Sequence, residues 1–300
     1  MNNNHRKVNG KPAKMTFEVV QPCQLLDFLL LNIKGKSRNN IKSFLSRGQV
    51  SVNGTIKTQF DYLLRPGQKV YVLYSATRGK SAEESPDIIY EDDDFIVINK
   101  PAGLVSVATD KERIYTAYTM VLQYMSRTNP KIRVFVVHRL DRDTSGILLF
   151  AKSEKIKNAL QDKWGELATE RRYIAVVEGQ LKEKSGTVKS WLRQTKTLVM
   201  YSSNTPGDGL EAITEYKVLK ENESYSMVDI QLKTGRKNQI RVHLKDLGHS
   251  VVGDKKYGAT TNPLNRLGLH ACRLTLTHPF SNQTLIFNAQ IPGSFDACFK

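Results

Sequence analysis

The order of hydrophobic and polar residues divides the chain into a short first part and a longer second part. In the first part, apolar residues at helical spacing predict one helix over 25–33 and a second over 41–45, which Gly48 ends. Asn53-Gly54, between two short apolar runs, predicts a β-hairpin after the helices. The first part is therefore expected to be a small helical hairpin joined to a few strands.

The second part has many short apolar runs bounded by polar residues, which are typical of strands, and few segments of helical spacing. We predict paired strands at 88–90 and 95–98, one helix from Ser153 to Ala168 and another from Arg236 to Leu247. Because strands and helices do not alternate regularly, the pattern favours an α+β fold class with a mixed, largely antiparallel sheet.

Composition sets the expected domain boundaries. Residues 1–15 are rich in Asn, Lys and Gly and are expected to form a disordered basic tail. Residues 16–74 then form the small first domain. The segment 75–86 contains Ser, Gly, Lys, Glu and Pro without apolar periodicity, which predicts a linker. The larger second domain is expected over residues 87–300.

Charge and cysteine content limit the classes of function. Lys and Arg number 45 against 29 Asp and Glu, a net charge of +16, which favours a polyanionic partner such as a nucleic acid over a generally basic protein. Cys23, Cys272 and Cys298 lie far apart without Cys-x-x-Cys spacing, so neither a disulfide scaffold nor a metal site is expected. No apolar run approaches the roughly 20 residues that span a bilayer, so we expect a cytoplasmic protein without a membrane partner, by default a monomer.

One acidic residue, Asp141, stands in a polar turn between two apolar runs, 134–137 and 147–151. Both runs are predicted to be buried strands, so the turn between them is held at both ends. Its density of polar residues exceeds what a connecting turn needs, and this favours a catalytic or binding role over an ordinary charged hairpin.

This turn resembles the signature of the RluA-type pseudouridine synthases, in which His-Arg-Leu-Asp is followed by Thr-Ser-Gly, here at 138–141 and 144–146. Further segments resemble the same family in the same order, at 98–104, 172–179, 235–244, 269–271 and 278–279. The resemblance implies an isomerase that moves uracil from an N1 to a C5 linkage on ribose and needs no cofactor. In one departure, Asn238 stands where the family usually has His, and an amide cannot carry a proton charge.

The resemblance also implies roles for individual residues. Asp141 would act on the ribose as a nucleophile or as a base, two roles that stay open. A carboxylate among buried strands needs a cation beside it to stay charged, and Arg241 would supply one. Tyr173 would pack against the target base and take part in proton transfer, or else fill the strand core. Arg139 would fill the gap left by an extruded base or bind phosphate. The other predicted substrate-binding residues are His138, Arg236, Gln239, Ile240 and Leu244.

The first domain resembles the alpha-L RNA-binding module found in a ribosomal small-subunit protein. Its basic face would hold RNA phosphates through Lys36, Arg38, Lys42 and Arg47, with Lys100 of the second domain as a further backbone contact. The alternative is an amphipathic helix whose solvated side is basic.

The leading hypothesis is an RNA pseudouridine synthase that acts on structured RNA, with large-subunit ribosomal RNA as the first choice and transfer RNA as the second. A ribosome-assembly factor that binds RNA without turnover stays open because of Asn238. Hydrolysis of a base or phosphodiester by paired acids is a further alternative. Asp143 is the second choice for the catalytic acid, or else it caps or braces the turn.

Overall fold

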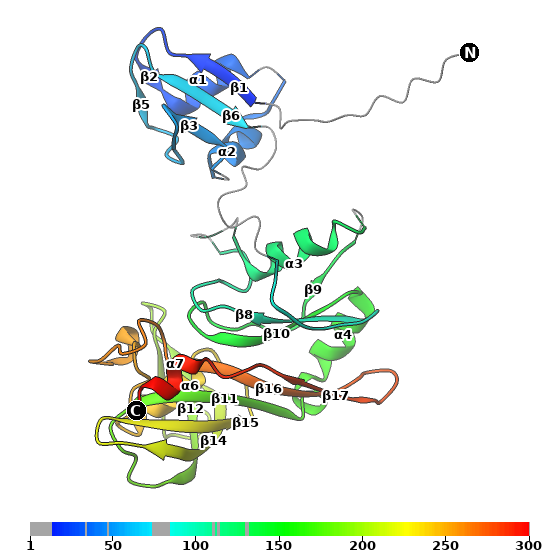
Figure 1. Ribbon diagram of the computed structural model, residues 1–300, viewed down its shortest axis with the longest axis vertical. Coiled ribbons are helices and arrows are strands. Elements are labelled where there is room, and N and C mark those ends of the chain that lie inside the picture. The colour runs from blue at the N-terminus through cyan, green and yellow to red at the C-terminus, as the bar shows by residue number, and fades with distance from the viewer. Residues whose placement is uncertain are drawn as a thin grey trace. The chain divides into compact units, whose positions relative to one another are not determined.

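A computed structural model describes residues 14–33, 35–46, 48–73, 85–109, 112, 115–129 and 132–299. The chain divides into two compact units, residues 1–84 and 85–300 (Figure 1). Most of the predicted tail and linker, and Arg47, lie outside the described residues. The predicted tail extends too far, because Lys14 and Met15 belong to the first strand. Within the described residues, no helix has the length and apolar character needed to cross a membrane.

The first unit packs two helices against a small sheet. Its elements are β1 (Lys14–Glu18), β2 (Cys23–Gln24), α1 (Leu25–Asn32), α2 (Arg38–Ser46), β3 (Val50–Val52), β4 (Thr55–Ile56), β5 (Leu63–Leu64) and β6 (Lys69–Leu73). The main sheet has the order β1-β6-β3-β4, and β2 pairs with β5. Asn53 and Gly54 join β3 to β4 with φ of 48° and 85°, as the predicted hairpin turn requires. The helix stripes and the strands share one buried apolar core.

The second unit is built on one large sheet with the order β13-β12-β14-β15-β11-β16-β10-β8-β7, to which β17 and β9 add at β16 and β10 (Figure 1). Among the strands that the structure describes, only β10 and β16 pair in parallel, so the prediction of a mixed, largely antiparallel sheet is confirmed. The strands are β7 (Ile88–Glu91), β8 (Phe95–Lys100), β9 (Phe135–Val136), β10 (Ser145–Ala151), β11 (Glu170–Glu178), β12 (Ser185–Gln194), β13 (Met200–Ser203), β14 (Leu210–Glu221), β15 (Tyr225–Leu232), β16 (Leu269–Thr277) and β17 (Thr284–Asn288). The helices are α3 (Ala117–Met125), α4 (Glu154–Asp162), α5 (Trp164–Leu167), α6 (Gln239–Asp246), η1 (Lys255–Tyr257) and α7 (Gly293–Ala297).

Three predicted elements differ in extent from the observed ones. The helix predicted over 153–168 starts as expected, with the Ser153 hydroxyl accepting the Ile156 N–H, but it breaks at Lys163 into α4 and α5. The helix predicted from Arg236 starts later, because Asn238 has left-handed backbone angles just before α6. The strand predicted over 134–137 is only the two residues of β9.

The strand that follows the Asp141 turn, β10, lies inside the large sheet between β16 and β8. All seven residues of β10 are buried. Its parallel register pairs Gly146 with Ala271 of β16. Gly146 has φ of +109°, and a Cβ atom at this position would lie 2.2 Å from the Ala271 carbonyl oxygen. Only glycine allows the two strands to approach so closely, and this fixes the start of β10 directly after the turn.

Candidate active site

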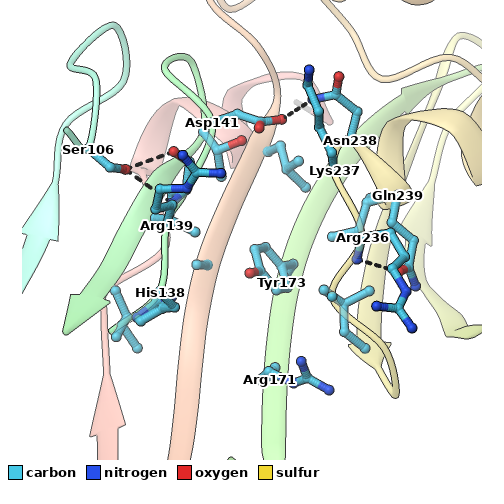
Figure 2. A pocket seen from close by; sticks show the side chains of 18 of the residues that line it. Ser106, His138, Arg139, Asp141, Arg171, Tyr173, Arg236, Lys237, Asn238 and Gln239 are labelled. Carbon is cyan, nitrogen blue, oxygen red and sulfur yellow. Dashed lines mark hydrogen bonds between the residues drawn. The ribbon is translucent and has the colours of Figure 1, made fainter. Parts of the chain in front are cut away.

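A pocket of about 700 Å³ opens at the Asp141 turn (Figure 2). Its walls come from the Asp141 turn, from β11, from the segment that leads into α6, and from β16. This volume falls within the range of small-ligand sites. The pocket thus brings together segments that are more than 100 residues apart in the sequence.

The Asp141 turn is tied on both sides to the segment that follows β8. The Ser106 hydroxyl donates to the Leu140 carbonyl at 2.7 Å and accepts the Leu140 N–H at 3.1 Å. On the other side, the Gly103 N–H donates to the Arg142 carbonyl at 2.9 Å. These bonds fix the backbone directly before and after Asp141.

Lys100 also holds this turn through hydrogen bonds and does not contact RNA. Its side chain is fully buried, and Nζ donates to the carbonyl oxygens of Pro101, Leu104 and Arg142 at 2.9, 2.7 and 2.9 Å. Burial lowers the pKa of Lys100 to about 7, while the charge of Asp143 opposes this shift. The predicted phosphate contact is wrong, because all three ammonium donors are used inside the protein.

Two donors share one oxygen of the Asp141 carboxylate. Asn238 Nδ2 donates to Oδ2 at 2.6 Å, and Arg241 Nη1 donates to the same atom at 3.2 Å. The contact predicted between Arg241 and Asp141 is therefore present. Oδ1 accepts no hydrogen bond from the described residues, so it is the oxygen available to a ligand.

Asp254 fixes the guanidinium of Arg241 from the other side. Its carboxylate accepts Arg241 Nε at 2.6 Å and Nη2 at 2.7 Å, and the guanidinium lies 4.8 Å from the centre of the Tyr257 ring. Burial alone would lower the pKa of Arg241, but the hydrogen bonds and charge of Asp254, with those of Asp141, raise it above its ordinary value. Arg241 thus stays charged and points one donor at Asp141.

Asn238 stands at a position where the backbone is left-handed. Its φ of 53° lies in the left-handed region, which Asn adopts more readily than most residues. The Tyr257 hydroxyl donates to Asn238 Oδ1 at 3.0 Å and itself accepts the Met200 N–H at 3.2 Å. These bonds orient the amide so that its nitrogen faces Asp141. An amide can therefore support the carboxylate at the position where the resemblance leads one to expect an imidazole.

Tyr173 lies on β11 between Asp141 and Arg171 in Figure 2. Burial raises the pKa of Tyr173 to about 12, with smaller effects from the charges of Arg171 and Asp141. At neutral pH the phenol is therefore protonated, and its part in proton transfer stays a prediction. Its contact with a target base stays a prediction.

The other predicted substrate residues fall into two groups. Arg139, Arg236 and Ile240 line the pocket, and Arg139 and Arg236 are exposed. Leu244 does not line the pocket, because it is buried in the apolar core below α6, so its predicted substrate contact is wrong. Gln239 also binds no substrate through its amide, because Thr234, Arg236, Ile213 and Thr214 already use its donors and acceptors.

His138 lines the pocket but is engaged by the protein. Its Nε2 accepts the Leu149 N–H at 3.1 Å, so Nδ1 carries the proton of the neutral ring. The ring stacks on Trp164 of α5 at a centroid distance of 4.9 Å. Burial lowers the pKa of His138 to about 4, and the charge of Arg171 acts in the same direction. His138 thus braces the turn as a neutral ring.

Four site residues were missed from the sequence: Ser106, Arg171, Asp254 and Tyr257. Arg171 alone had a signal, since it stands two residues before Tyr173 on a predicted strand and such residues share a face. Ser106 and Asp254 lie in irregular segments, and Tyr257 lies in the short helix η1; none of these segments has an apolar periodicity. In the part of the chain that the structure describes, no group of three or more His, Cys, Asp or Glu could hold a metal ion.

The basic residues of the first unit lie apart from this pocket in sequence. Lys36, Arg38 and Lys42 are exposed. Lys42 Nζ lies 5.8 Å from the centre of the Phe60 ring, which is itself half exposed. Their contact with RNA phosphates stays a prediction.

Known proteins that are similar to this chain in sequence or fold carry pseudouridine or pseudouridylate synthase in their names. A family model described as RNA pseudouridylate synthase matches residues 94–246. The Bacillus subtilis protein named uncharacterized RNA pseudouridine synthase YhcT is 31% identical over 290 residues, which are 95% of each chain. The Nitrosomonas europaea protein named ribosomal large subunit pseudouridine synthase D is 32% identical over 282 residues, 88% of this chain and 80% of that protein. Human RNA pseudouridylate synthase domain containing 4 has a similar fold, with a TM-score of 0.58 at 22% identity over 72% of this chain and 92% of that chain.

Proposed function

The chain belongs to the RNA pseudouridylate synthase family and is an isomerase of uridine in RNA, and from this premise we propose that Asp141 carries the reaction and that large-subunit ribosomal RNA is the substrate. The observation that supports the first part is the pair of donors on Asp141 Oδ2, which orients the carboxylate, while Oδ1 accepts no hydrogen bond from the described residues.

Asp141 Oδ1 is the proposed reacting atom. It either attacks ribose C1′ or removes a proton from the ribose, and in both cases the bond from C1′ to uracil N1 breaks with its electron pair staying on the base. The freed base then turns and C5 bonds to C1′. As this bond forms, the bond from Oδ1 to C1′ breaks, or the removed proton returns to the ribose, so that Asp141 is restored. The proton on C5 then leaves and N1 takes up a proton, which balances the isomerisation. Arg241 balances the charge of the carboxylate before and after these steps, and Tyr173 packs against the base during the turn.

A relative's name and the charge of the chain support the proposed RNA substrate. One relative at 32% identity is named as a large-subunit ribosomal RNA enzyme. The net charge of +16 suits a large folded RNA, and the exposed Lys36, Arg38 and Lys42 of the first unit would hold its phosphates. Transfer RNA is the second candidate, because the pocket residues recognise a uridine rather than the RNA around it.

Tritium release tests the catalytic assignment. The protein is incubated with ribosomal or transfer RNA transcripts that carry tritium on uridine C5, and released tritium is counted. Native protein is expected to release tritium and Asp141→Asn to release none above background. Asp143→Asn, which changes an exposed acid two residues away, is the matched control and should keep its activity. Equal release by the native protein and Asp141→Asn would refute the role of Asp141.

A comparison of transcripts tests the substrate assignment. Release from large-subunit ribosomal RNA but not from transfer RNA is expected. Pseudouridine maps of cells with and without the protein would then identify the uridine. A map that differs only in transfer RNA would refute the ribosomal assignment and leave the role of Asp141 intact.

A further inference from the structure

Arg171 is a buried cation without an anionic partner. The residue is 9% exposed, and its Nη2 donates to the Lys233 carbonyl at 2.7 Å. Nε is buried and has no hydrogen-bond partner among the described residues. None of the described carboxylates lies within ion-pair distance of its guanidinium. Burial lowers the pKa of Arg171, and the nearby charge of Arg236 acts in the same direction.

Such an arrangement is costly for a folded protein. A charge taken out of water needs a partner, and a buried donor without an acceptor destabilises the folded state. Other arginines near this strand have carboxylates: Arg172 pairs with Asp229, and Arg273 lies 2.9 Å from Glu170. Arg171 lines a pocket that a ligand can enter. Because Nε is closed off from solvent, the donor that such a ligand can reach is Nη1, which makes no hydrogen bond to the described residues.

The position of Arg171 indicates which part of a ligand it meets. Arg171 and Tyr173 are two residues apart on β11 and both line the pocket. Figure 2 shows Tyr173 between Asp141 and Arg171. The charges of both outer residues act on the Tyr173 phenol. A uridine with its ribose at Asp141 and its base against Tyr173 would point the far edge of the base toward Arg171.

We propose that Arg171 binds a carbonyl oxygen of the target uracil and stabilises the negative charge that the base acquires when its bond to ribose breaks. This inference rests on the proposed function. When the C1′–N1 bond breaks, the electron pair left on the base spreads over N1, O2 and O4. A guanidinium in a buried pocket stabilises such a charge more strongly than water does, because its donors are already oriented.

The turn of the base gives the same residue a second use. Rotation about the axis through N3 and C6 exchanges N1 with C5 and also exchanges O2 with O4. A donor fixed at the far edge of the base therefore meets a carbonyl oxygen both before and after the turn. A backbone phosphate fits this position less well, because phosphates stay largely hydrated and the exposed Arg236 and Lys237 are better placed to bind them.

Two substitutions test the proposal. Arg171→Met removes the charge at similar length, and Arg171→Lys keeps the charge without the planar donors. We expect Arg171→Met to lower kcat by about 100- to 1,000-fold, as loss of one such donor does elsewhere, and Arg171→Lys to lower it less. RNA affinity and its salt dependence should stay within about threefold of the native values. The matched control is Arg172→Lys, since Arg172 pairs with Asp229 and does not line the pocket.

Substrate changes test the contact directly and do not depend on how well Arg171→Met folds. Short RNAs carry 2-thiouridine or 4-thiouridine at the target position, and single-turnover rates are measured with native protein and Arg171→Lys. Sulfur accepts hydrogen bonds more weakly than oxygen. At the carbonyl oxygen that Arg171 binds, replacement by sulfur should therefore lower the single-turnover rate by a smaller factor in Arg171→Lys than in the native protein. Additive losses at both oxygens would overturn the proposal.

The outcomes separate this inference from the proposed function. If native protein makes pseudouridine and Arg171→Met has the same kcat, Arg171 has no such role and the function stands. If Arg171→Met weakens RNA binding and reduces its salt dependence while kcat is unchanged, the residue binds phosphate and the uracil contact is refuted. If native protein forms no pseudouridine on any RNA, the proposed function and this inference both fall.

Discussion

The amide of Asn238 is expected to contribute to catalysis through its hydrogen bond to Asp141. Its Nδ2 donates to Asp141 Oδ2 at 2.6 Å, and Arg241 is the only other described residue that donates to that oxygen. A hydrogen bond to a charged group contributes about 1.5–3 kcal/mol. At about 1.4 kcal/mol for each factor of ten, its loss corresponds to a fall in kcat of about 10- to 150-fold.

Two substitutions at this position separate the amide from the backbone. Asn238→Gly and Asn238→Ala both remove the amide, but alanine also meets the left-handed φ of 53°, which costs about 1–2 kcal/mol for residues with a Cβ. Both variants should therefore lose the same activity, while Asn238→Ala should also be less stable than Asn238→Gly. Asn238→His should keep more activity than either, because an imidazole N–H can donate to the same oxygen and His tolerates positive φ.

Single-turnover tritium release at saturating RNA measures the activity, and urea unfolding measures the stability. Tyr257→Phe is a useful companion, since it removes the hydroxyl that orients the amide and keeps the ring under Arg241. It should lower kcat by less than Asn238→Gly does. A native rate for Asn238→Gly, alongside an inactive Asp141→Asn, would refute the reasoning.

Two further predictions concern stability. Gly146→Ala should destabilise the protein by about 3 kcal/mol or more in urea unfolding, because its Cβ would overlap the Ala271 carbonyl at a positive φ. The control Gly165→Ala has open space around its Cβ and should be neutral or slightly stabilising. Equal effects of the two substitutions would contradict this account. Burial lowers the pKa of His243 and His270 to about 4, so the stability that these neutral rings give above pH 6.5 should be lost as pH falls toward 4, by at most about 3 kcal/mol for each residue. His243→Gln should reduce the slope of the free energy of unfolding against pH. A free energy of unfolding that does not change between pH 7.5 and pH 5 would disprove this prediction.

Local patterns predicted individual elements of both units well. The Asn53-Gly54 hairpin and the buried strand after Asp141 depend on residues close in sequence, so they were visible in the order of polar and apolar positions. The break at Lys163 was not visible, because the apolar spacing continues through it. Propensity does not show where a helix must bend to fit its neighbours.

Long-range placement could be predicted only in part. The contact between Arg241 and Asp141 followed from a resemblance, not from any local signal. Lys100 was misplaced because a lysine is usually exposed, and nothing nearby shows that three carbonyls surround it. Asp254 and Tyr257 lie just before and within the short helix η1, whose approach to α6 depends on the whole fold.

Because hydrogen bonds hold the Asp141 turn to distant segments, isomerase activity depends on the complete folding of the second unit. Ser106 reaches the turn from before it, while Asn238 and Arg241 reach it from about 100 residues after it. A fragment lacking either side would hold the acid without its supports. In a refolding experiment, isomerase activity should return after the spectroscopic signals of secondary structure, and the delay would measure how late these distant strands and loops close on one another.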